Sequence, residues 1–232
     1  MNIEEYKQKI FERLKINGWG EVLKPFIFSL EFEKILTTLY NFTKIDKRFT
    51  PSFKDMFRAF EECPYSDLKL VIVNNEPYNQ INMADGISFS CSKMIKPHPV
   101  LKFIFEDINT TVYSGHSVSI DKDLKRWSNQ GILMLNTSLT AEIGKSNQHH
   151  EIWKPFIAYL FDYFNNYNKK VVYIYMGKIA QEWSEYVKND HKIFTSHPAS
   201  AAYTKQLIWN SNNTFLKVQQ LVAEIYGYII KW

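Results

Sequence analysis

The chain has 232 residues, of which 45% are hydrophobic and 22% charged, so it is long and apolar enough to bury a proper core. Its formal net charge of +4 and its pI of about 8.8 are compatible with a nucleic-acid partner but do not require one. No apolar run approaches the length of a membrane span, and the charged, amphipathic start MNIEEYKQKIFERLK is not a secretory signal, so we expect a cytoplasmic protein.

Hydrophobic periodicity predicts helices, and continuous apolar runs predict buried strands. In chain order we expect helix 3–16, helix 29–42, helix 52–61, strand 68–74, helix 99–109, strand 131–136, helix 151–166, strand 170–176, helix 178–188, strand 192–196 and helix 211–227. Strands separated by helices indicate a parallel sheet. We therefore predict one α/β domain over residues 1–232, with a central, mainly parallel sheet of four strands flanked by helices on both faces.

The expected strands end in polar residues. The first runs into Asn74 to Tyr78, and the others lead to Asn136, Gly177 and His197. Because the carboxyl ends of parallel strands meet at one edge of a sheet, these residues predict a cleft there, which is where open α/β sheets bind ligands.

Other chemistries find little support in the sequence. There is no Gly-rich phosphate loop and no nucleophile elbow. His149, His150 and Glu151 lack the separation that places metal ligands on one helical face. Cys63 and Cys91 have no metal or disulfide spacing, so we expect buried or free thiols in a reducing compartment. We expect no metal and no cofactor.

Several segments follow one another in an order that points to a family: NNEPYN, GISFS, GILMLNTSLT, NQHHEIW, YMGKIAQ and SHPASAAY. This order resembles the uracil-DNA glycosylase superfamily. Within the superfamily, the resemblance is closest to the classical uracil-DNA glycosylase family. That family carries GQDPYH, an HGLSFS-like stretch, an LLLN strand end, an NSH-plus-Trp segment, WG-x-x-AQ and an HPSPLS loop. The resemblance runs from Trp19 to Trp232 and implies the fold described above.

The resemblance also implies a chemistry. A glycosylase takes a base out of the stack and breaks its bond to the sugar, so the sugar becomes cation-like and the base leaves with negative charge. By resemblance, Phe89 stacks on the flipped base, the Asn136 amide reads the edge of a pyrimidine, and His197 donates a hydrogen bond to O2 of the leaving base. Tyr78 crowds C5 and keeps thymine out, and Asn75 belongs to the base-binding set.

Glu76 stands where the family has aspartate. The family carboxylate orients the attacking water and stabilises the cationic sugar. Glutamate has the same charge and one more methylene, and a displacement of about 1 Å in a catalytic group can cost on the order of 100-fold in rate. Either the pocket is rebuilt for Glu76, or activity is reduced, or the substrate differs. Purely structural roles stay open for these residues: core packing for Phe89 and Tyr78, and turns or caps for Glu76, Asn136 and His197.

Departures from the family pattern fall on the parts expected to touch DNA. Asn79 replaces histidine, Ala201 replaces a wedging leucine, and serine positions hold Val100, Lys178, Ala199 and Ala202. Lys96, Lys178 or Lys205 could supply charge in exchange, and Tyr203 could serve as the wedge. The predicted DNA-contacting residues are Lys96, Pro97, Lys178, Ala199, Ser200, Ala201 and Tyr203. Without a leucine wedge we expect single-stranded or distorted DNA to be favoured.

Three functions remain open at this point. The default is a monofunctional glycosylase, a hydrolase of N-glycosyl bonds that excises uracil and leaves an abasic site. The second excises a modified pyrimidine, such as glucosylated hydroxymethylcytosine of phage DNA, in anti-phage defence, although Tyr78 argues against a bulky group at C5. The third is a homologue with weak or lost catalysis that binds DNA or a replication protein. For the enzyme we expect DNA as partner and a monomer, with no membrane contact.

Overall fold

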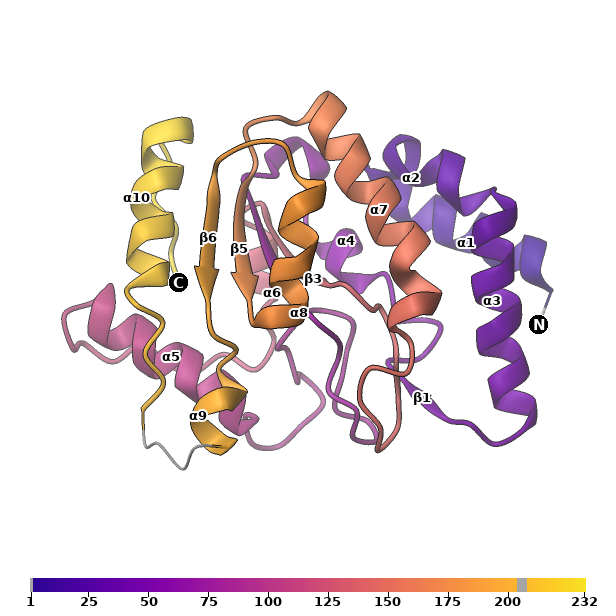
Figure 1. Cartoon of the computed structure of the whole chain (residues 1–232), viewed down its shortest axis with the longest axis horizontal. Coiled ribbons are helices and arrows are strands. Elements are labelled where there is room, and N and C mark those ends of the chain that lie inside the picture. The colour runs from indigo at the N-terminus through magenta and orange to yellow at the C-terminus, as the bar shows by residue number, and fades with distance from the viewer. Residues whose placement is uncertain (1, 204–207) are drawn as a thin grey trace.

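The structure is a computed structural model that describes residues 2–203 and 208–232, with only the backbone described at 202 and 203 (Figure 1). Its helices and strands, in chain order, are α1 (Ile3–Lys15), α2 (Trp19–Ile27), α3 (Leu30–Lys44), β1 (Phe49–Thr50), α4 (Arg58–Glu62), β2 (Leu70–Asn74), α5 (Pro99–Thr111), α6 (Lys125–Ser128), β3 (Ile132–Asn136), β4 (Ala141–Glu142), α7 (His150–Tyr167), β5 (Val172–Met176), α8 (Lys178–Glu182), β6 (Lys192–Thr195), α9 (Ala199–Tyr203) and α10 (Thr214–Tyr226). Short 3₁₀ turns lie at Tyr65–Asp67 and Trp183–Tyr186.

The central sheet has the order β3-β2-β5-β6, and every neighbouring pair is parallel. The predicted α/β class with four parallel strands is thereby confirmed. All four strands end at the same edge, which faces α9 in Figure 1. The register places Asn74 directly opposite Asn136 where β2 and β3 end. The polar strand ends that the sequence singled out are therefore neighbours in space.

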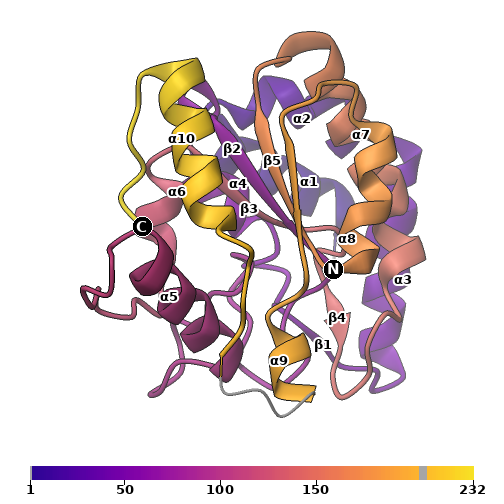
Figure 2. The same cartoon turned by 60° about the vertical axis from the view of Figure 1, so that its left-hand side comes forward.

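Alternate residues of the strands face two separate apolar clusters. Val71, Val73, Leu133 and Leu135 face the helices α1, α2, α3 and α7, whereas Ile72 faces the other side with α5 and α10. Figures 1 and 2 show these two groups of helices on opposite sides of the sheet. The sheet is thus covered on both faces, as its continuous apolar strands require.

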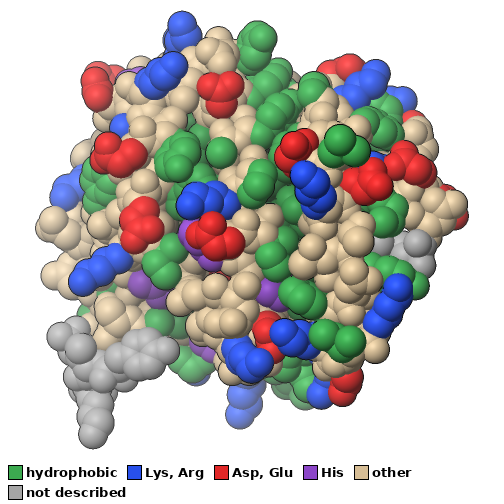
Figure 3. Space-filling model, turned by 45° about the vertical axis from the view of Figure 1, so that its right-hand side comes forward, with side chains coloured by type: hydrophobic (Ala, Val, Ile, Leu, Met, Phe, Trp, Pro, Cys, Tyr) green, Lys and Arg blue, Asp and Glu red, His purple; other side chains and the backbone are tan. Residues whose placement is uncertain are grey.

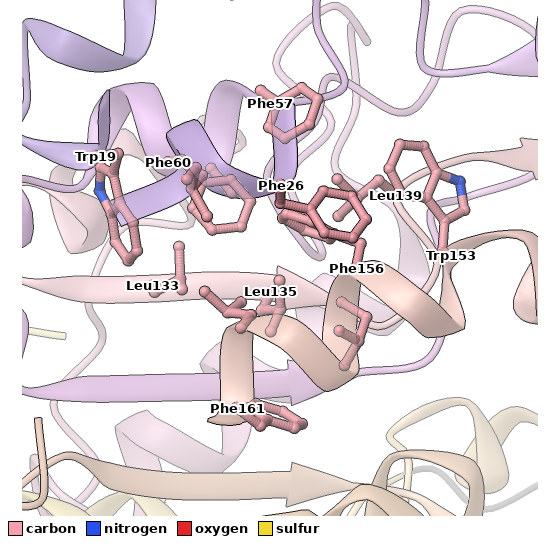
Figure 4. Close-up of a cluster of buried hydrophobic side chains, with 14 of the residues drawn as sticks. Trp19, Phe26, Phe57, Phe60, Leu133, Leu135, Leu139, Trp153, Phe156 and Phe161 are labelled. Carbon is pink, nitrogen blue, oxygen red and sulfur yellow. The ribbon is translucent and has the colours of Figure 1, made fainter. Parts of the chain in front are cut away.

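Aromatic rings fill the first of these clusters (Figure 4). The labelled aromatic side chains are Trp19, Phe26, Phe57, Phe60, Trp153, Phe156 and Phe161, all of them buried. Full burial of such a side chain contributes about 1.5–3 kcal/mol. Much of the high aromatic content of the chain therefore serves the core and has no part in stacking on bases.

Some elements of the structure were not predicted from the sequence. Helix α2 has only nine residues and contains Gly20 and Pro25, two residue types that disfavour a helix interior. The segment 178–188 forms α8 and then a 3₁₀ turn, and 52–61 forms a helix only from Arg58. Strands β1 and β4 pair over two residues each, too short to leave a pattern in the sequence.

Two simpler expectations can be compared with the structure directly. Cys63 and Cys91 are both buried and free, as predicted. Within the part of the chain that the structure describes, no helix combines the length and apolar character needed to cross a membrane.

Candidate active site

A cavity of about 460 Å³ opens at the carboxyl edge of the sheet. Its lining comes from the end of β2, the turn before α5, the loop before α7, the start of α8 and the segment after β6: Asn74, Asn75, Glu76, Pro77, Tyr78, Asn79, Gln80, Phe89, His98, Val100, Ser146, Asn147, Met176, Gly177, Lys178, Ile179, His197 and Ala199. The cavity therefore brings together Asn75, Glu76, Tyr78, Phe89 and His197 of the predicted site, from segments far apart in the sequence.

The Tyr78 side chain is held at both ends. Its hydroxyl donates to the backbone carbonyl of Phe89 at 3.1 Å, and its ring lies against the His98 ring with centroids 4.2 Å apart. His98 in turn caps α5, since its Nδ1 accepts from the Val100 N–H at 3.2 Å. Burial raises the pKa of the Tyr78 phenol well above its usual range, so it stays a neutral donor. The tyrosine forms a fixed wall of the cavity.

Phe89 sits on a strained turn. Its φ of 62° lies in the left-handed region, which a bulky residue rarely adopts. The turn is anchored by Asp85, which is 1% exposed, accepts from Ser90 Oγ at 2.6 Å and from the Ser92 N–H at 2.9 Å, and pairs with Arg58 at 3.1 Å. Strain that surrounding contacts maintain in this way is typical of functional sites.

The same turn depends on Gly86. Its φ is +97°, and a Cβ there would lie 1.9 Å from the Asp55 carbonyl oxygen, so only glycine fits. The GISFS segment is therefore specified by backbone geometry as well as by its aromatic ring, which is consistent with a turn built to present Phe89 to the cavity.

His197 follows β6 and points into the cavity as a neutral imidazole. Its Nδ1 accepts from the Ala199 N–H at 3.0 Å, so the ring proton resides on Nε2. Nε2 then donates to Asn74 Oδ1 at 3.0 Å. Burial lowers the pKa of His197 to about 4, so it is uncharged at neutral pH. Gly177 permits this placement, because a Cβ at Gly177 would lie 2.9 Å from the His197 Cβ.

Glu76 reaches across the cavity to the loop before α7. Its Oε2 accepts from the Asn147 N–H at 2.8 Å. Burial raises the pKa of the Glu76 carboxyl above its usual range, against the opposing effect of hydrogen bonds from the Asn147 N–H and from Ser146. Asn75 Nδ2 donates to Asn147 Oδ1 at 2.7 Å. The longer glutamate side chain is thus matched by a loop that holds its carboxylate.

Asn136 is close to the site but screened from it. Its side chain is 4% exposed and does not line the cavity, whereas the neighbouring Asn74 does. Asn74 Nδ2 donates to Asn136 Oδ1 at 2.9 Å. The sequence reasoning assigned no role to Asn74, although a signal was present: the motif GQDPYH has glycine at the position where NNEPYN has Asn74.

Of the described residues that are predicted to contact DNA, only Lys178 and Ala199 line the cavity, and we call them, together with Lys96, Pro97 and Ser200, which lie near lining residues in the sequence, the rim. Lys178 and Lys96 are exposed, Pro97 and Ser200 are half-buried, and Ala199 lines the cavity. On the face in Figure 3, basic and acidic side chains are interspersed, with no single-sign patch among the described side chains shown there.

The structure describes only part of the segment that follows His197. Ala201 is 1% exposed and belongs to the apolar cluster of α5 and α10, so its methyl group does not face a ligand in this conformation. The side chains of Ala202 and Tyr203, and all of Lys205, lie outside the described residues. The prediction that Tyr203 is a wedge therefore stays a prediction.

Among the residues that the structure describes, no group of three or more His, Cys, Asp or Glu is arranged to hold a metal ion. His149 is instead a core residue. Its Nδ1 pairs with Thr140 Oγ1 at 2.8 Å, and that hydroxyl also accepts from Trp153 Nε1 at 2.8 Å. Burial lowers the pKa of His149 to about 4.

Fold and cavity together define an α/β protein with a pocket lined by polar and aromatic side chains at the carboxyl edge of a parallel sheet. The sequence model of the "Uracil DNA glycosylase superfamily" matches residues 60–223. A uracil-DNA glycosylase of Clostridium perfringens is 31% identical over 93% of this chain and 95% of its own length. A uracil-DNA glycosylase of Acinetobacter baylyi is 29% identical over 94% of each chain.

Solved structures agree on the fold. The crystal structure of mimivirus uracil-DNA glycosylase superposes with a TM-score of 0.80 at 21% identity, covering 92% of this chain and 85% of that one. A structure from Nitratifractor salsuginis gives a TM-score of 0.60 at 18% identity, covering 93% and 96%. The chain therefore belongs to the uracil-DNA glycosylase superfamily. The expected enzyme class, a hydrolase acting on N-glycosyl bonds, is confirmed.

Proposed function

We propose that this chain is a monofunctional DNA glycosylase that flips a pyrimidine, uracil by default, out of DNA and hydrolyses its bond to the sugar. The observation that carries the proposal is the convergence of Glu76, Tyr78, Phe89 and His197 on one cavity. Glu76 and Tyr78 lie in the turn after β2, Phe89 lies in the turn anchored by Asp85, and His197 follows β6. Contacts within the protein hold these residues in place. Such an arrangement is preorganised for a base.

In the proposed reaction the bond between C1′ and the base nitrogen breaks, and its electron pair leaves with the base. The His197 Nε2–H donates to the base oxygen where negative charge develops, and the neutral ring needs no proton transfer to do so. The ionised Glu76 carboxylate faces the cation-like sugar and accepts a proton from the water that forms the new C1′–O bond. Phe89 stacks on the base, and the fixed Tyr78 ring limits substituents at C5.

The residues at the rim favour single-stranded DNA, or a duplex that is already distorted, as the substrate. Lys178 is an exposed cation in the cavity lining, Lys96 is an exposed cation two residues before the lining residue His98, and Ala199 offers only a methyl group to the cavity. We propose that these lysines attract phosphate through charge alone. We also propose a monomer that works as one unit over residues 1–232, in the cytoplasm, without a metal or cofactor.

The test is a glycosylase assay on matched oligonucleotides, single- and double-stranded, read out as alkali-labile abasic sites. They carry uracil, thymine, cytosine, hydroxymethylcytosine or glucosylated hydroxymethylcytosine. We expect cleavage at uracil that is lost in His197→Ala and Glu76→Gln. His116→Ala and Glu12→Gln are the matched controls, because both residues are exposed and neither lines the cavity.

Each other outcome has a distinct meaning. Cleavage confined to a modified cytosine would replace uracil by that base and assign the altered loops to specificity. DNA binding without cleavage at any base would contradict the proposed glycosylase activity and would indicate a protein that only binds DNA. Cleavage that survives His197→Ala would contradict the proposed role of the imidazole.

A further inference from the structure

The Asn74 carboxamide occupies a position that polar groups of the site surround on three sides. Its Oδ1 accepts from His197 Nε2 at 3.0 Å, and its Nδ2 donates to Asn136 Oδ1 at 2.9 Å and to the Glu76 carbonyl oxygen at 3.2 Å. The side chain is 4% exposed and lines the cavity. Its hydrogen-bonding capacity is therefore largely used inside the protein.

Two independent partners establish which way this amide points. His197 Nδ1 accepts a backbone N–H, so Nε2 carries the proton and must face an oxygen. The Glu76 carbonyl can only accept, so it must face the amide nitrogen. Both requirements are met by the same orientation of Asn74. Asn136 consequently presents its oxygen to Asn74.

Two of the three partners of Asn74 form a cradle with one donor, His197 Nε2–H, beside one acceptor, Asn136 Oδ1. Such a cradle is complementary to a group that carries C=O next to N–H. The O2 and N3–H of uracil and thymine present that pair, whereas cytosine presents an acceptor at both O2 and N3. The Asn74 carboxamide is itself a C=O next to an N–H, so the cradle is filled by a side chain with the same pattern as the base edge.

We propose that Asn74 controls the entry of a base into this pocket: its carboxamide stands in for the edge of an imide pyrimidine, and a base enters the cradle only by displacing it. The inference rests on the proposed function and deepens it by naming the residue that controls access. It also accounts for the separation of Asn136 from the cavity, since Asn74 lies between them.

The size of the effect follows from the contacts that must be broken. At the central value of about 1 kcal/mol net for each neutral hydrogen bond, releasing the two or three bonds of Asn74 weakens base binding by about 30- to 150-fold. Replacing Asn74 by glycine, the residue of the motif GQDPYH at this position, removes the competitor and leaves His197 and Asn136 facing the cavity.

The experiment compares wild type with Asn74→Gly and Asn74→Ala on a single-stranded oligonucleotide with one uracil. Asn166→Ala, which removes an exposed amide on α7, is the matched control, and thermal melting checks folding. We expect kcat/KM to rise at least about 10-fold in both Asn74 variants and to stay unchanged in the control. Values for the variants equal to or below wild type would overturn the inference while leaving the glycosylase activity intact.

A second measurement decides the inference if none of these proteins cleaves DNA, in which case the proposed function fails by itself. Free uracil is titrated into each protein, and the side-chain ¹⁵N resonances of His197 are followed. We expect uracil to shift them in Asn74→Gly at concentrations that leave wild type unaffected. Equal shifts in both proteins, or no shift in the variant, would overturn the proposal.

Discussion

The floor of the cavity and its rim are built in different ways. On the floor, Asn74 and His197 line the cavity at or just after strand ends, and the Asn74 amide bonds both to His197 and to Asn136 behind it. On the rim, Lys96 and Lys178 project into solvent, and neither forms an ion pair within the described part of the chain. Changes on the floor leave buried polar groups without partners, whereas changes on the rim only alter exposed charge.

This contrast separates two kinds of departure from the family pattern. On the floor, a substitution requires a matching partner, as Glu76 illustrates with the Asn147 N–H that receives its carboxylate. On the rim, Lys178 stands at a serine position with its side chain exposed and with no ion pair among the described residues. We therefore expect floor residues to act as a unit and rim residues to act independently and additively.

The largest effect is expected from His197→Ala. Removing one preorganised donor to developing negative charge lowers kcat by about 100- to 1,000-fold. The measurement is single-turnover cleavage of the best substrate of the oligonucleotide panel. His116→Ala removes an exposed histidine and should leave the rate unchanged. A loss below tenfold would contradict the proposed role of His197.

Asp85→Ala tests whether the floor depends on the turn that carries Phe89. The substitution leaves Arg58 without its most buried partner and frees Ser90 and Ser92, so we expect the free energy of unfolding to fall by about 3 kcal/mol. Urea denaturation measures this change.

Asp123→Ala is the matched control for Asp85→Ala, because Asp123 pairs with the same Arg58 but is 39% exposed. It should lower the free energy of unfolding by less than about 1 kcal/mol. Equal effects of the two substitutions would show that burial of Asp85 is irrelevant.

The pH dependence of kcat/KM sharpens the comparison further. Burial raises the pKa of Glu76, so its ionised fraction falls on acidification at a higher pH than for an exposed glutamate. His197, with a pKa of about 4, contributes no inflection near its ordinary value of 6.5. We expect one acidic limb above pH 4.5 that is absent from the residual activity of Glu76→Gln. A limb that persists in that variant would assign it to another group.

The smallest effect is expected at the rim. Lys178→Ala should weaken DNA binding only a few-fold and reduce the slope of log K against log salt by about 1, equally for all bases. Fluorescence anisotropy at several salt concentrations measures both quantities. Lys34→Ala on α3, which is also exposed but does not line the cavity, should change neither. An effect that depended on the base would place Lys178 on the floor.

Much of the fold could be read from periodicity, because each buried strand is a continuous apolar run and most helices carry one apolar stripe. Strand β2 was predicted as 68–74 and is Leu70–Asn74. Helix α2 is short and interrupted by Gly20 and Pro25, and the strands β1 and β4 pair over only two residues each, so neither was predicted. For the site, the order of the motifs singled out Glu76, Phe89 and His197, which all line the cavity.

By itself, the sequence determined the strands, the polar residues at their ends and the family to which the chain belongs, because these depend on local pattern and motif order. Only the tertiary structure decided which polar group faces which. Residue 74 lies 62 positions before Asn136 and 123 before His197, and the register of the sheet places its amide between them. Hydrogen-bond partners across such separations depend on how strands align in space, which periodicity along the chain does not encode.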